Sequence, residues 1–346
     1  MGSADGNFGL VQSCGRVYIP VRNASRSIIQ HIEKMRLVES LLSPPRTEER
    51  VQTAMLQMHE NAAAVRVIES RRPLVIGHRG YSHLAPENTL AAFKLAIEAG
   101  ADLVEMDYRH SKDGVPVVIH DPKLDRTTNA VRCWKRKRVR VASKTAAELR
   151  RLDAGRWFGP HYSGAKIPLL SEALDFVQTG SIALVEQKAG DARTCICLLR
   201  EKGLINKIII QSFNWEYLCR IHQHEPEQVL AALGPARILP SGKRPLGVVR
   251  KLNAAWLKQA AKTGARVIVW TQKLSKKAVH LAHERGLKVW VYTINKPKLA
   301  RRLLAAGVDG IITNDPVLIR KEVADQESSQ SQAPSPREAP SFKLRS

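Results

Sequence analysis

The sequence predicts an α/β protein, a (β/α)8 TIM barrel, because short apolar strand runs alternate with amphipathic helical runs through most of the chain. Eight strand runs begin near residues 74, 102, 182, 207, 228, 266, 288 and 309. Helical runs lie between most of them, at 88–99, 192–202, 214–224, 250–263, 275–285 and 297–306, and another begins near 316. Eight β/α units over about 250 residues are typical of a closed parallel barrel. An open doubly wound sheet is the alternative, but no glycine-rich dinucleotide turn follows the first strand.

Composition divides the 346 residues into three parts. Residues 1–72 are expected to form a helical N-terminal extension, with two helical runs separated by a Ser-Pro-Pro break at 43–45. Residues 73–322 are expected to form the barrel, with an insertion after the second strand at about 121–180 that is rich in Arg, Gly and Pro. Residues 323–346 are rich in Ser, Gln and Pro, and we expect a disordered tail there.

The first β/α unit ends its strand in polar residues. An apolar run from Leu74 is followed directly by His78 and Arg79. The next helix is expected to begin at Asn88, a residue type that caps helix N-termini, and to end before Gly100. His78 and Arg79 are therefore placed at a strand end.

The second strand returns on itself through a predicted hairpin. Glu105 and Asp107 are two residues apart on this strand, so both side chains leave the same face. The Asp-Gly pair at 113–114 predicts a two-residue turn, which pairs position 107 with position 120 to within one residue of register. His120 is therefore expected to fold back beside Asp107.

The third strand adds another carboxylate and another cation at its end. Glu186 and Lys188 alternate onto one face, as Glu105 and Asp107 do. Three carboxylates at a barrel mouth repel one another unless a cation joins them, and an all-oxygen ligand set suits Mg²⁺ or Ca²⁺ better than Zn²⁺. Arg79 and Lys188 supply positive charge that can bind a substrate phosphate.

The two histidines can supply proton transfer. Acid–base catalysis needs a base for the nucleophile and an acid for the leaving group, and the pKa of histidine suits both roles. His78 and His120 can share them. His120 is also expected close enough to Asp107 to coordinate a metal, so that alternative stays open.

Short motifs follow one another along the chain in a fixed order. They are H-R-G at 78–80, P-E-N-T at 86–89, E-x-D at 105–107, K-D-G at 112–114, H-D at 120–121, IPLLSEAL at 167–174, VEQK at 185–188 and GVDGIITNDP at 307–316. As an ordered set, covering about residues 73–322, they resemble the glycerophosphodiester phosphodiesterase family. The resemblance implies the same barrel, with the inserted segment over its mouth, and His78 and His120 as the catalytic pair. The metal ligands that it implies are Glu105, Asp107 and Glu186.

The resemblance also implies a reaction. A family member is expected to hydrolyse a glycerophosphodiester to glycerol 3-phosphate and an alcohol, with one divalent cation, Mg²⁺ or Ca²⁺. A lysophospholipase D-like activity on membrane lysolipids is one alternative. A catalytically inactive phospholipid-binding barrel is another, but a binding module has no need of both histidines.

The net charge of +23 is unevenly distributed along the chain. Residues 232–305 hold 17 Lys and Arg but one acidic residue, and a second basic run lies at 135–140. Such charge attracts phosphate-bearing partners, so peripheral contact with an anionic membrane and steering of a small anionic substrate are both expectations, beside a merely solvated surface. No nucleic-acid-binding motif accompanies the charge, and nucleic acid is not favoured as a partner. Five scattered cysteines, with no secretory or membrane-spanning segment, favour a cytoplasmic location.

Overall fold

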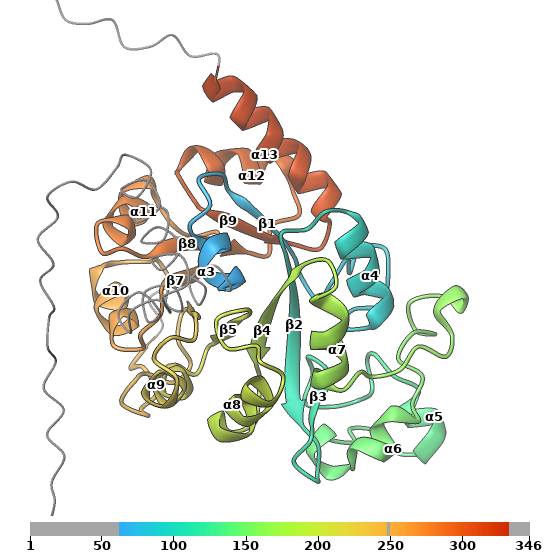
Figure 1. Ribbon diagram of the computed structural model, residues 1–346. Helices are drawn as coiled ribbons and strands as arrows, with labels where there is room; N and C mark the ends of the chain where they lie inside the picture. Colours follow the sequence, from blue (N-terminus) through green and yellow to red (C-terminus); the bar gives the residue numbers. More distant parts are fainter. Residues whose placement is uncertain (1–61, 248–249, 332–346) are drawn as a thin grey trace, which may run out of the picture. The chain divides into compact units, whose positions relative to one another are not determined.

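The chain folds into a closed barrel of parallel strands, as the sequence predicts (Figure 1). The computed structural model describes residues 62–247 and 250–331. The barrel strands in this part of the chain are β1 (Leu74–Gly77), β2 (Leu103–His110), β4 (Ile182–Gln187), β5 (Ile209–Ser212), β6 (Leu230–Leu233), β7 (Val267–Thr271), β8 (Lys288–Tyr292) and β9 (Gly310–Thr313). Neighbours pair in parallel, and β1 pairs with both β2 and β9, which closes the barrel.

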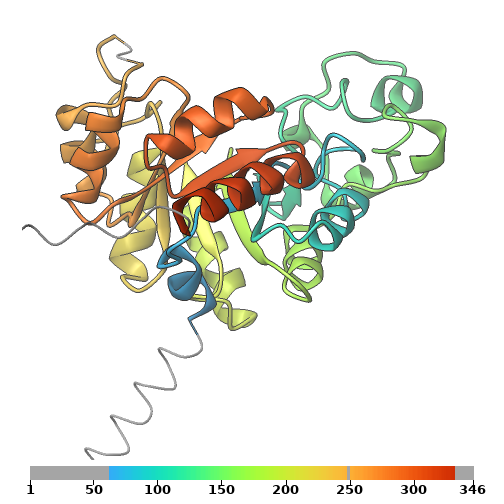
Figure 2. The same ribbon diagram turned by 90° about the horizontal axis from the view of Figure 1, so that it is seen from above.

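Helices surround the barrel and cover the outer face of its strands (Figures 1 and 2). They are α4 (Leu90–Glu98), α7 (Leu170–Val177), α8 (Ala192–Glu201), α9 (Trp215–His224), α10 (Ala254–Ala261), α11 (Lys276–His283), α12 (Pro297–Ala305) and α13 (Pro316–Ser331). Four consecutive helices, α8 to α11, begin at a side chain that accepts a backbone N–H of the first turn. These caps are Asp191, Asn214, Asn253 and Ser275.

The barrel has an inner core and an outer core. Alternate strand residues such as Ile76, Leu103 and Leu184 fill the inside, and their neighbours pack outward against the helices. The short helix α3 (Ala63–Ile68) contributes Ala64 and Ile68 to the inner core, where both are buried. Apolar side chains fill the inside of the barrel. Polar side chains on the inner face at its carboxyl end are therefore exceptions that need partners, and they mark a candidate site.

The insertion after β2 has a small apolar core of its own. It contains β3 (Pro116–Val118), α5 (Ala130–Trp134), η1 (Val141–Ser143), α6 (Ala146–Arg150) and η2 (Pro160–Tyr162). Helix α7 falls within the range expected for the insertion, about 121–180, but its buried side chains belong to the outer core of the barrel. The inserted segment therefore ends before α7.

The register of the β2–β3 hairpin differs by one residue from the predicted register. Tyr108 pairs with Val118, whereas the predicted register pairs it with Ile119. Asp107 therefore faces Ile119 rather than His120. The turn has three residues and ends at Gly114, whose φ of 78° lies in the left-handed region. An Asp-Gly pair fits this turn as well as the shorter one, and the sequence does not separate the two.

Two boundaries can be compared with the expected ones. Helix α13 continues to Ser331, past residue 323 where a disordered tail is expected, because Val323 is buried and no Gly or Pro interrupts the helix after Pro316. The first predicted helix of the N-terminal extension, most of the second, and the chain beyond residue 331 lie outside the described residues, and α3 falls at the end of the second predicted run. In the described ranges no helix is long and apolar enough to cross a membrane. The cytoplasmic location stays a prediction.

Candidate active site

Side chains that face the inside of the barrel become polar at the carboxyl ends of the strands. Along β2, Leu103 belongs to the inner core, so alternation puts Glu105 and Asp107 on the same inner face. Along β4, Leu184 and Glu186 have the same relation. The same alternation carries β1, β4 and β5 on to His78, Lys188 and Gln211. This end of a (β/α)8 barrel is where reactive groups collect.

Three carboxylates lie together on this face. Glu105, Asp107 and Glu186 are buried, and each offers an oxygen within 4.8 Å of those of the other two. Burial and the charges of Asp107 and Glu186 raise the pKa of Glu105 well above its usual value. Burial and the charge of Asp107 likewise raise the pKa of Glu186 to about 7. The fold therefore holds like charges together at an electrostatic cost that a bound cation would remove.

Two cations pair with this acidic cluster. Lys188 Nζ lies 3.2 Å from Asp107 Oδ1 and also contacts Glu186 Oε1, and Arg79 Nε lies 3.2 Å from Asp107 Oδ2. Although burial acts in the opposite direction, Lys188 and Arg79 lower the pKa of Asp107 to about 2. Within the described ranges, neither Asp107 Oδ1 nor Glu186 Oε1 accepts a well-formed hydrogen bond, and His120 adds no atom to the cluster. Buried oxygens of this kind fit Mg²⁺ or Ca²⁺.

Asn88 holds Asp107 and does not cap a helix. Its Nδ2 donates to Asp107 Oδ2 at 2.8 Å, and its Oδ1 accepts the backbone N–H of Asp107 at 3.0 Å. The helix expected to begin at Asn88 is α4, and its cap is Thr89, whose hydroxyl accepts the N–H of Ala92. The predicted cap is therefore wrong by one residue, and Asn88 is a site residue that the sequence analysis missed.

Each histidine is held through its Nδ1. His78 Nδ1 lies 2.7 Å from Asn314 Oδ1, and this carbonyl oxygen can only accept, so Nδ1 carries the proton. Burial, together with the charge of Arg79, lowers the pKa of His78 to about 4. His120 Nδ1 lies 2.6 Å from a carboxylate oxygen of Asp121. Both rings therefore keep Nε2 for another partner.

A chain of ion pairs connects His120 to Arg79. Asp121 also accepts from Arg126 Nε at 2.7 Å, and Arg126 binds both carboxylate oxygens of Glu87, at 2.7 and 2.8 Å. Glu87 in turn accepts from Arg79 Nη1 at 2.8 Å. Burial and Arg126 act in opposite directions on the pKa of Glu87, and its net direction is downward. Glu87 is thus held by two guanidinium groups and lies outside the acidic cluster.

One pocket of about 210 Å³ collects these residues at the barrel mouth. It is lined by His78, Arg79, Glu105, His120, Glu186, Lys188, Gln211, Phe213, Leu233, Arg237, Tyr292, Thr293 and Ile312. Asp107 is not among the lining residues, although it pairs with Arg79 and Lys188 that are. All the site residues expected from the sequence are therefore in the pocket or in contact with residues that line it.

Asn88, Asp121 and Asn314 are functional neighbours that the sequence analysis did not single out. Asp121 directly follows His120, and Asn314 directly follows the end of β9, so these two sequence positions were a usable signal. Their contacts with His120 and His78 depend on the tertiary fold. Together, a (β/α)8 barrel whose mouth holds three carboxylates, two cations and two histidines has the parts needed to bind and cleave a phosphate ester.

Comparison with known proteins agrees with this class. The Glycerophosphoryl diester phosphodiesterase family matches residues 78–318. A glycerophosphodiester phosphodiesterase of Bacillus subtilis (strain 168) is 32% identical over 269 residues, which are 72% of this chain and 86% of that protein. One from Caldanaerobacter subterraneus is 32% identical over 252 residues, 71% of this chain and 95% of that protein. The solved structure of an Oleispira antarctica phosphodiesterase, in complex with the product sn-glycerol-3-phosphate, has a TM-score of 0.63 and 29% identity, and covers 74% of this chain and 99% of that chain.

The chain therefore belongs to the glycerophosphoryl diester phosphodiesterase family. It is an enzyme, a hydrolase of phosphoric diesters.

Proposed function

We propose that this enzyme hydrolyses a glycerophosphodiester to glycerol 3-phosphate and an alcohol, with one divalent cation, Mg²⁺ or Ca²⁺. The observation that carries the proposal is the convergence of a buried carboxylate cluster and two anchored histidines at one pocket. The product named for the Oleispira structure, sn-glycerol-3-phosphate, is consistent with it.

The pocket suits a phosphodiester group with one negative charge. The ligands for the cation are Glu105, Asp107 and Glu186, and a cation there would neutralise charge on the phosphoryl oxygens. Arg79 and Lys188 provide N–H donors to the same oxygens from the pocket wall. Both side chains are held in place by Asp107, so they are oriented before substrate arrives.

The histidines transfer protons. Asn314 and Asp121 occupy the Nδ1 positions of His78 and His120, which leaves each Nε2 free to face a substrate oxygen. One imidazole takes a proton from the attacking water as its oxygen bonds to phosphorus, and the other, protonated at Nε2, gives that proton to the leaving alkoxide as the second P–O bond breaks.

The test is direct. The purified full chain is stripped with a chelator, then given Mg²⁺ or Ca²⁺ and a set of deacylated glycerophosphodiesters, and both products are measured. Glycerol 3-phosphate formed in step with the free alcohol, and only after cation is restored, supports the proposal. Equal turnover in excess chelator contradicts the role of the metal. Choline phosphate or another phosphorylated alcohol in place of glycerol 3-phosphate contradicts the position of the bond cleaved.

A lysophospholipase D-like reaction uses the same site on an acylated substrate. It differs from the first proposal only in the glycerol arm, so lysophospholipids belong in the same assay. An inactive phospholipid-binding barrel is disfavoured, because binding alone does not require two histidines with Nε2 kept free.

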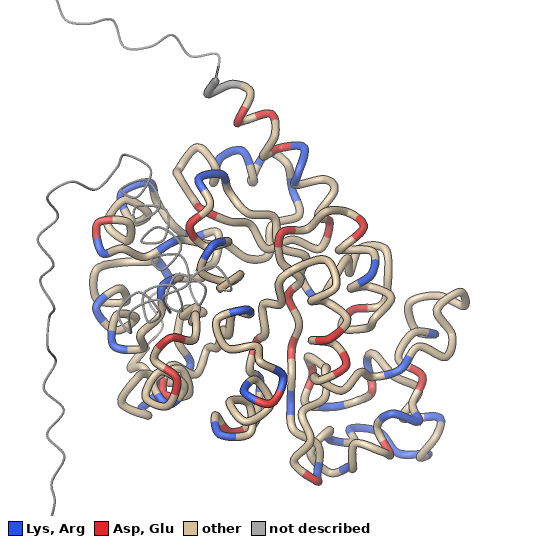
Figure 3. Tube along the Cα trace, in the orientation of Figure 1, with Lys and Arg blue, Asp and Glu red and all other residues tan. Residues whose placement is uncertain are grey.

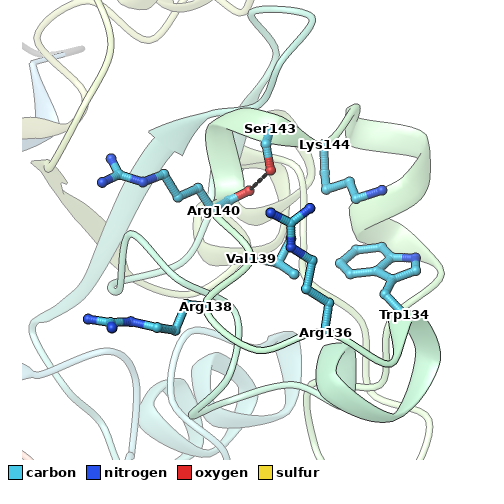
Figure 4. A pocket seen from close by; sticks show the side chains of 7 residues that line it. All are labelled: Trp134, Arg136, Arg138, Val139, Arg140, Ser143 and Lys144. Atoms are coloured by element: carbon cyan, nitrogen blue, oxygen red, sulfur yellow. Dashed lines mark hydrogen bonds between the residues drawn. The ribbon is translucent and has the colours of Figure 1, made fainter.

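Peripheral contact with an anionic membrane is a second candidate, and a basic pocket on the insertion favours it. Seven residues line this pocket of about 600 Å³ (Figure 4): Trp134, Arg136, Arg138, Val139, Arg140, Ser143 and Lys144. Figure 3 shows Lys and Arg gathered in this part of the insertion. Lys144 Nζ lies 4.4 Å from the Trp134 ring, and within the described ranges the guanidinium groups of Arg136, Arg138 and Arg140 form no ion pair. Lys144 is also paired with Glu148 at 2.8 Å, so the three arginines are the cations available to lipid phosphates, beside a half-buried indole that suits an interface.

Vesicle binding tests this second candidate. Arg136→Glu with Arg138→Glu is expected to weaken binding to vesicles that contain phosphatidylserine, and the same protein is expected to bind phosphatidylcholine vesicles weakly. Lys276→Glu with Lys277→Glu makes the same change of charge on α11 and is the control. Equal loss in both double variants means that binding follows net charge, and unchanged binding in the first removes the insertion as a membrane contact.

A further inference from the structure

A second cavity opens beside the catalytic pocket. It has a volume of about 960 Å³ and shares Phe213, Arg237 and Tyr292 with the 210 Å³ catalytic pocket. The smaller pocket lies below the ~300–1,000 Å³ that ligand sites usually occupy. A complete diester bound with its phosphate among the histidines must therefore extend one of its arms into neighbouring space, and the larger cavity lies on the other side of the same three wall residues.

Four cations line this larger cavity, and no acidic side chain does. They are Arg237, Arg244, Arg250 and Lys273. All four belong to the basic stretch 232–305, and the described part of the chain gives none of their side chains an ion-pair partner. Charges that have no partner in a concave site concentrate their potential within it. The four residues are exposed to solvent, but they also line a space beside the catalytic pocket, so this part of the stretch can act on a bound substrate.

The remaining lining is largely apolar. Phe213, Pro235, Ala236, Ile238, Pro245 and Tyr292 form it. Phe213 and Tyr292 meet edge to face with ring centroids 6.0 Å apart, and Tyr292 is fixed by a 2.7 Å hydrogen bond to the carbonyl of Gly234. Such a wall contacts the carbon skeleton of an alcohol, and the four cations contact its charged end.

The Phe213 ring of this wall already contacts two cations of the protein. The guanidinium carbon of Arg237 lies 4.7 Å from the centroid of the Phe213 ring, and Lys188 Nζ lies 5.8 Å from it. These two cations occupy the cation–π positions that a choline group would use. A cationic alcohol would meet like charge in this cavity without compensation.

On these grounds we infer that the cavity receives the alcohol arm of the diester and selects an arm that carries its own anionic group, a phosphate or a carboxylate, over a cationic amine. The inference rests on the proposed hydrolysis of glycerophosphodiesters. It specifies the class of substrate, which is a diester whose alcohol arm carries a second negative charge at its far end.

Two matched substrates isolate the second charge. Glycerophosphoglycerol has a neutral alcohol arm, and bis(glycerophospho)glycerol, the deacylated form of cardiolipin, has the same arm extended by a second phosphodiester. At low ionic strength kcat/KM is expected to be about tenfold or more higher for the second, and lowest for glycerophosphocholine. The ratio of the first two values is the readout.

The variant pair separates contact from general steering. Arg244→Gln with Lys273→Gln removes two lining charges, whereas Lys276→Gln with Lys277→Gln removes two exposed charges from α11, which does not line the cavity. We expect the first double variant to lower the ratio about tenfold, toward unity, and the control to keep it within about twofold. Melting temperatures establish that both variants fold.

Three results would overturn the inference. They are an equal loss of the ratio in both double variants, a preference of the unmodified enzyme for glycerophosphocholine, and turnover of lysophospholipids above that of their deacylated forms, which would place an acyl chain in the cavity. Calorimetric affinities of the two matched diesters for the His120→Ala variant measure the same preference without turnover. If no diester releases glycerol 3-phosphate, the proposed function fails, and this affinity ratio still decides whether the cavity selects anions.

Discussion

The side chain of Asn88 forms two hydrogen bonds with Asp107: Nδ2 donates to the carboxylate at 2.8 Å, and Oδ1 accepts the backbone N–H at 3.0 Å. Asn88 itself has a φ of 58°, a left-handed conformation that asparagine tolerates better than most residues. The amide thus orients one carboxylate of the acidic cluster from a loop that precedes α4. Neighbours that orient metal ligands are often nearly as important as the ligands.

Replacing Asn88 is expected to weaken cation binding. Asn88→Gly keeps the left-handed backbone accessible but removes both contacts with Asp107, so affinity for Mg²⁺ or Ca²⁺ should fall about 10–100-fold. The measurement is a titration of the melting temperature with the cation, since a bound ion stabilises the folded state. Thr89→Ala, which removes the α4 cap, is the matched control and should lower stability without changing the affinity. Unchanged affinity in Asn88→Gly would mean that Asp107 needs no such support.

The two histidines are expected to be essential for turnover. His78→Ala and His120→Ala should each lower kcat by about two to four orders of magnitude, the usual loss for a general acid or base. Steady-state kinetics with a glycerophosphodiester measure the effect, and cation titration shows whether binding of the ion is retained. A near-normal kcat in either variant removes that histidine from the mechanism. Loss of cation affinity in His120→Ala would favour its role as a ligand.

Asp121 and Asn314 are expected to act through the histidines. Asp121→Asn keeps a neutral acceptor beside His120 Nδ1 but removes the carboxylate and its pair with Arg126, so kcat should fall less than in His120→Ala. Asn314→Ala should behave in the same way relative to His78. Since these residues position a ring rather than touch the substrate, kcat should change more than KM. A loss equal to that of the histidine variants would place them in direct contact with the reacting groups.

The carboxylates are expected to bind the cation. Asp107→Asn and Glu186→Gln keep shape but remove charge, so cation affinity should fall and excess cation should partly restore activity. In the unmodified enzyme the ion should raise the melting temperature, because it relieves repulsion in the cluster of three carboxylates. Asp175→Asn, at an exposed ion pair on α7, should leave both properties unchanged. Full activity in chelator would remove the cation from the mechanism.

The sequence predicted the barrel, and it predicted that the expected site residues lie together at one end of it, because both depend on local pattern. The strand runs show which residues lie at the carboxyl end of the barrel, where reactive groups collect. The two-residue spacing of Glu105 and Asp107 places both side chains on the same face of their strand. Three features of the structure could not be predicted from the sequence, because they depend on contacts between residues far apart in the chain. The hairpin register depends on a turn in which the backbone N–H of Lys112 donates to the carbonyl of Lys144. Asn88 is bound by Asp107, which lies 19 positions later. His78 is held by Asn314, the residue that follows the last strand. The cavity lined by the basic stretch was not predictable either, because it forms where the loops after β6 and β7 lie together.

Asp102 is expected to stabilise the barrel in a pH-dependent manner. Its carboxylate accepts from Arg72 Nη1 at 3.0 Å and from the backbone N–H of Val75 at 2.8 Å, and lies 3.3 Å from Arg320. Burial acts in the opposite direction, but the bonds from Arg72 and Val75 lower the pKa of Asp102 below its usual value. Because the pKa of the folded state lies below that of the unfolded state, this contribution is present at neutral pH and is lost as pH falls through the folded-state value.

Asp102→Asn should therefore lower the free energy of unfolding by about 1–3 kcal/mol at neutral pH, as expected when a buried charged acceptor is lost. The difference from the unmodified chain should shrink below about pH 4, near the unfolded-state pKa of aspartate, because the native carboxylate then begins to lose the same advantage. Denaturant unfolding at several pH values measures it. Asp175→Asn, whose carboxylate is exposed, should change stability by less than about 0.5 kcal/mol at every pH. A penalty in Asp102→Asn that stays constant down to low pH would show that shape, and not charge, makes Asp102 stabilising.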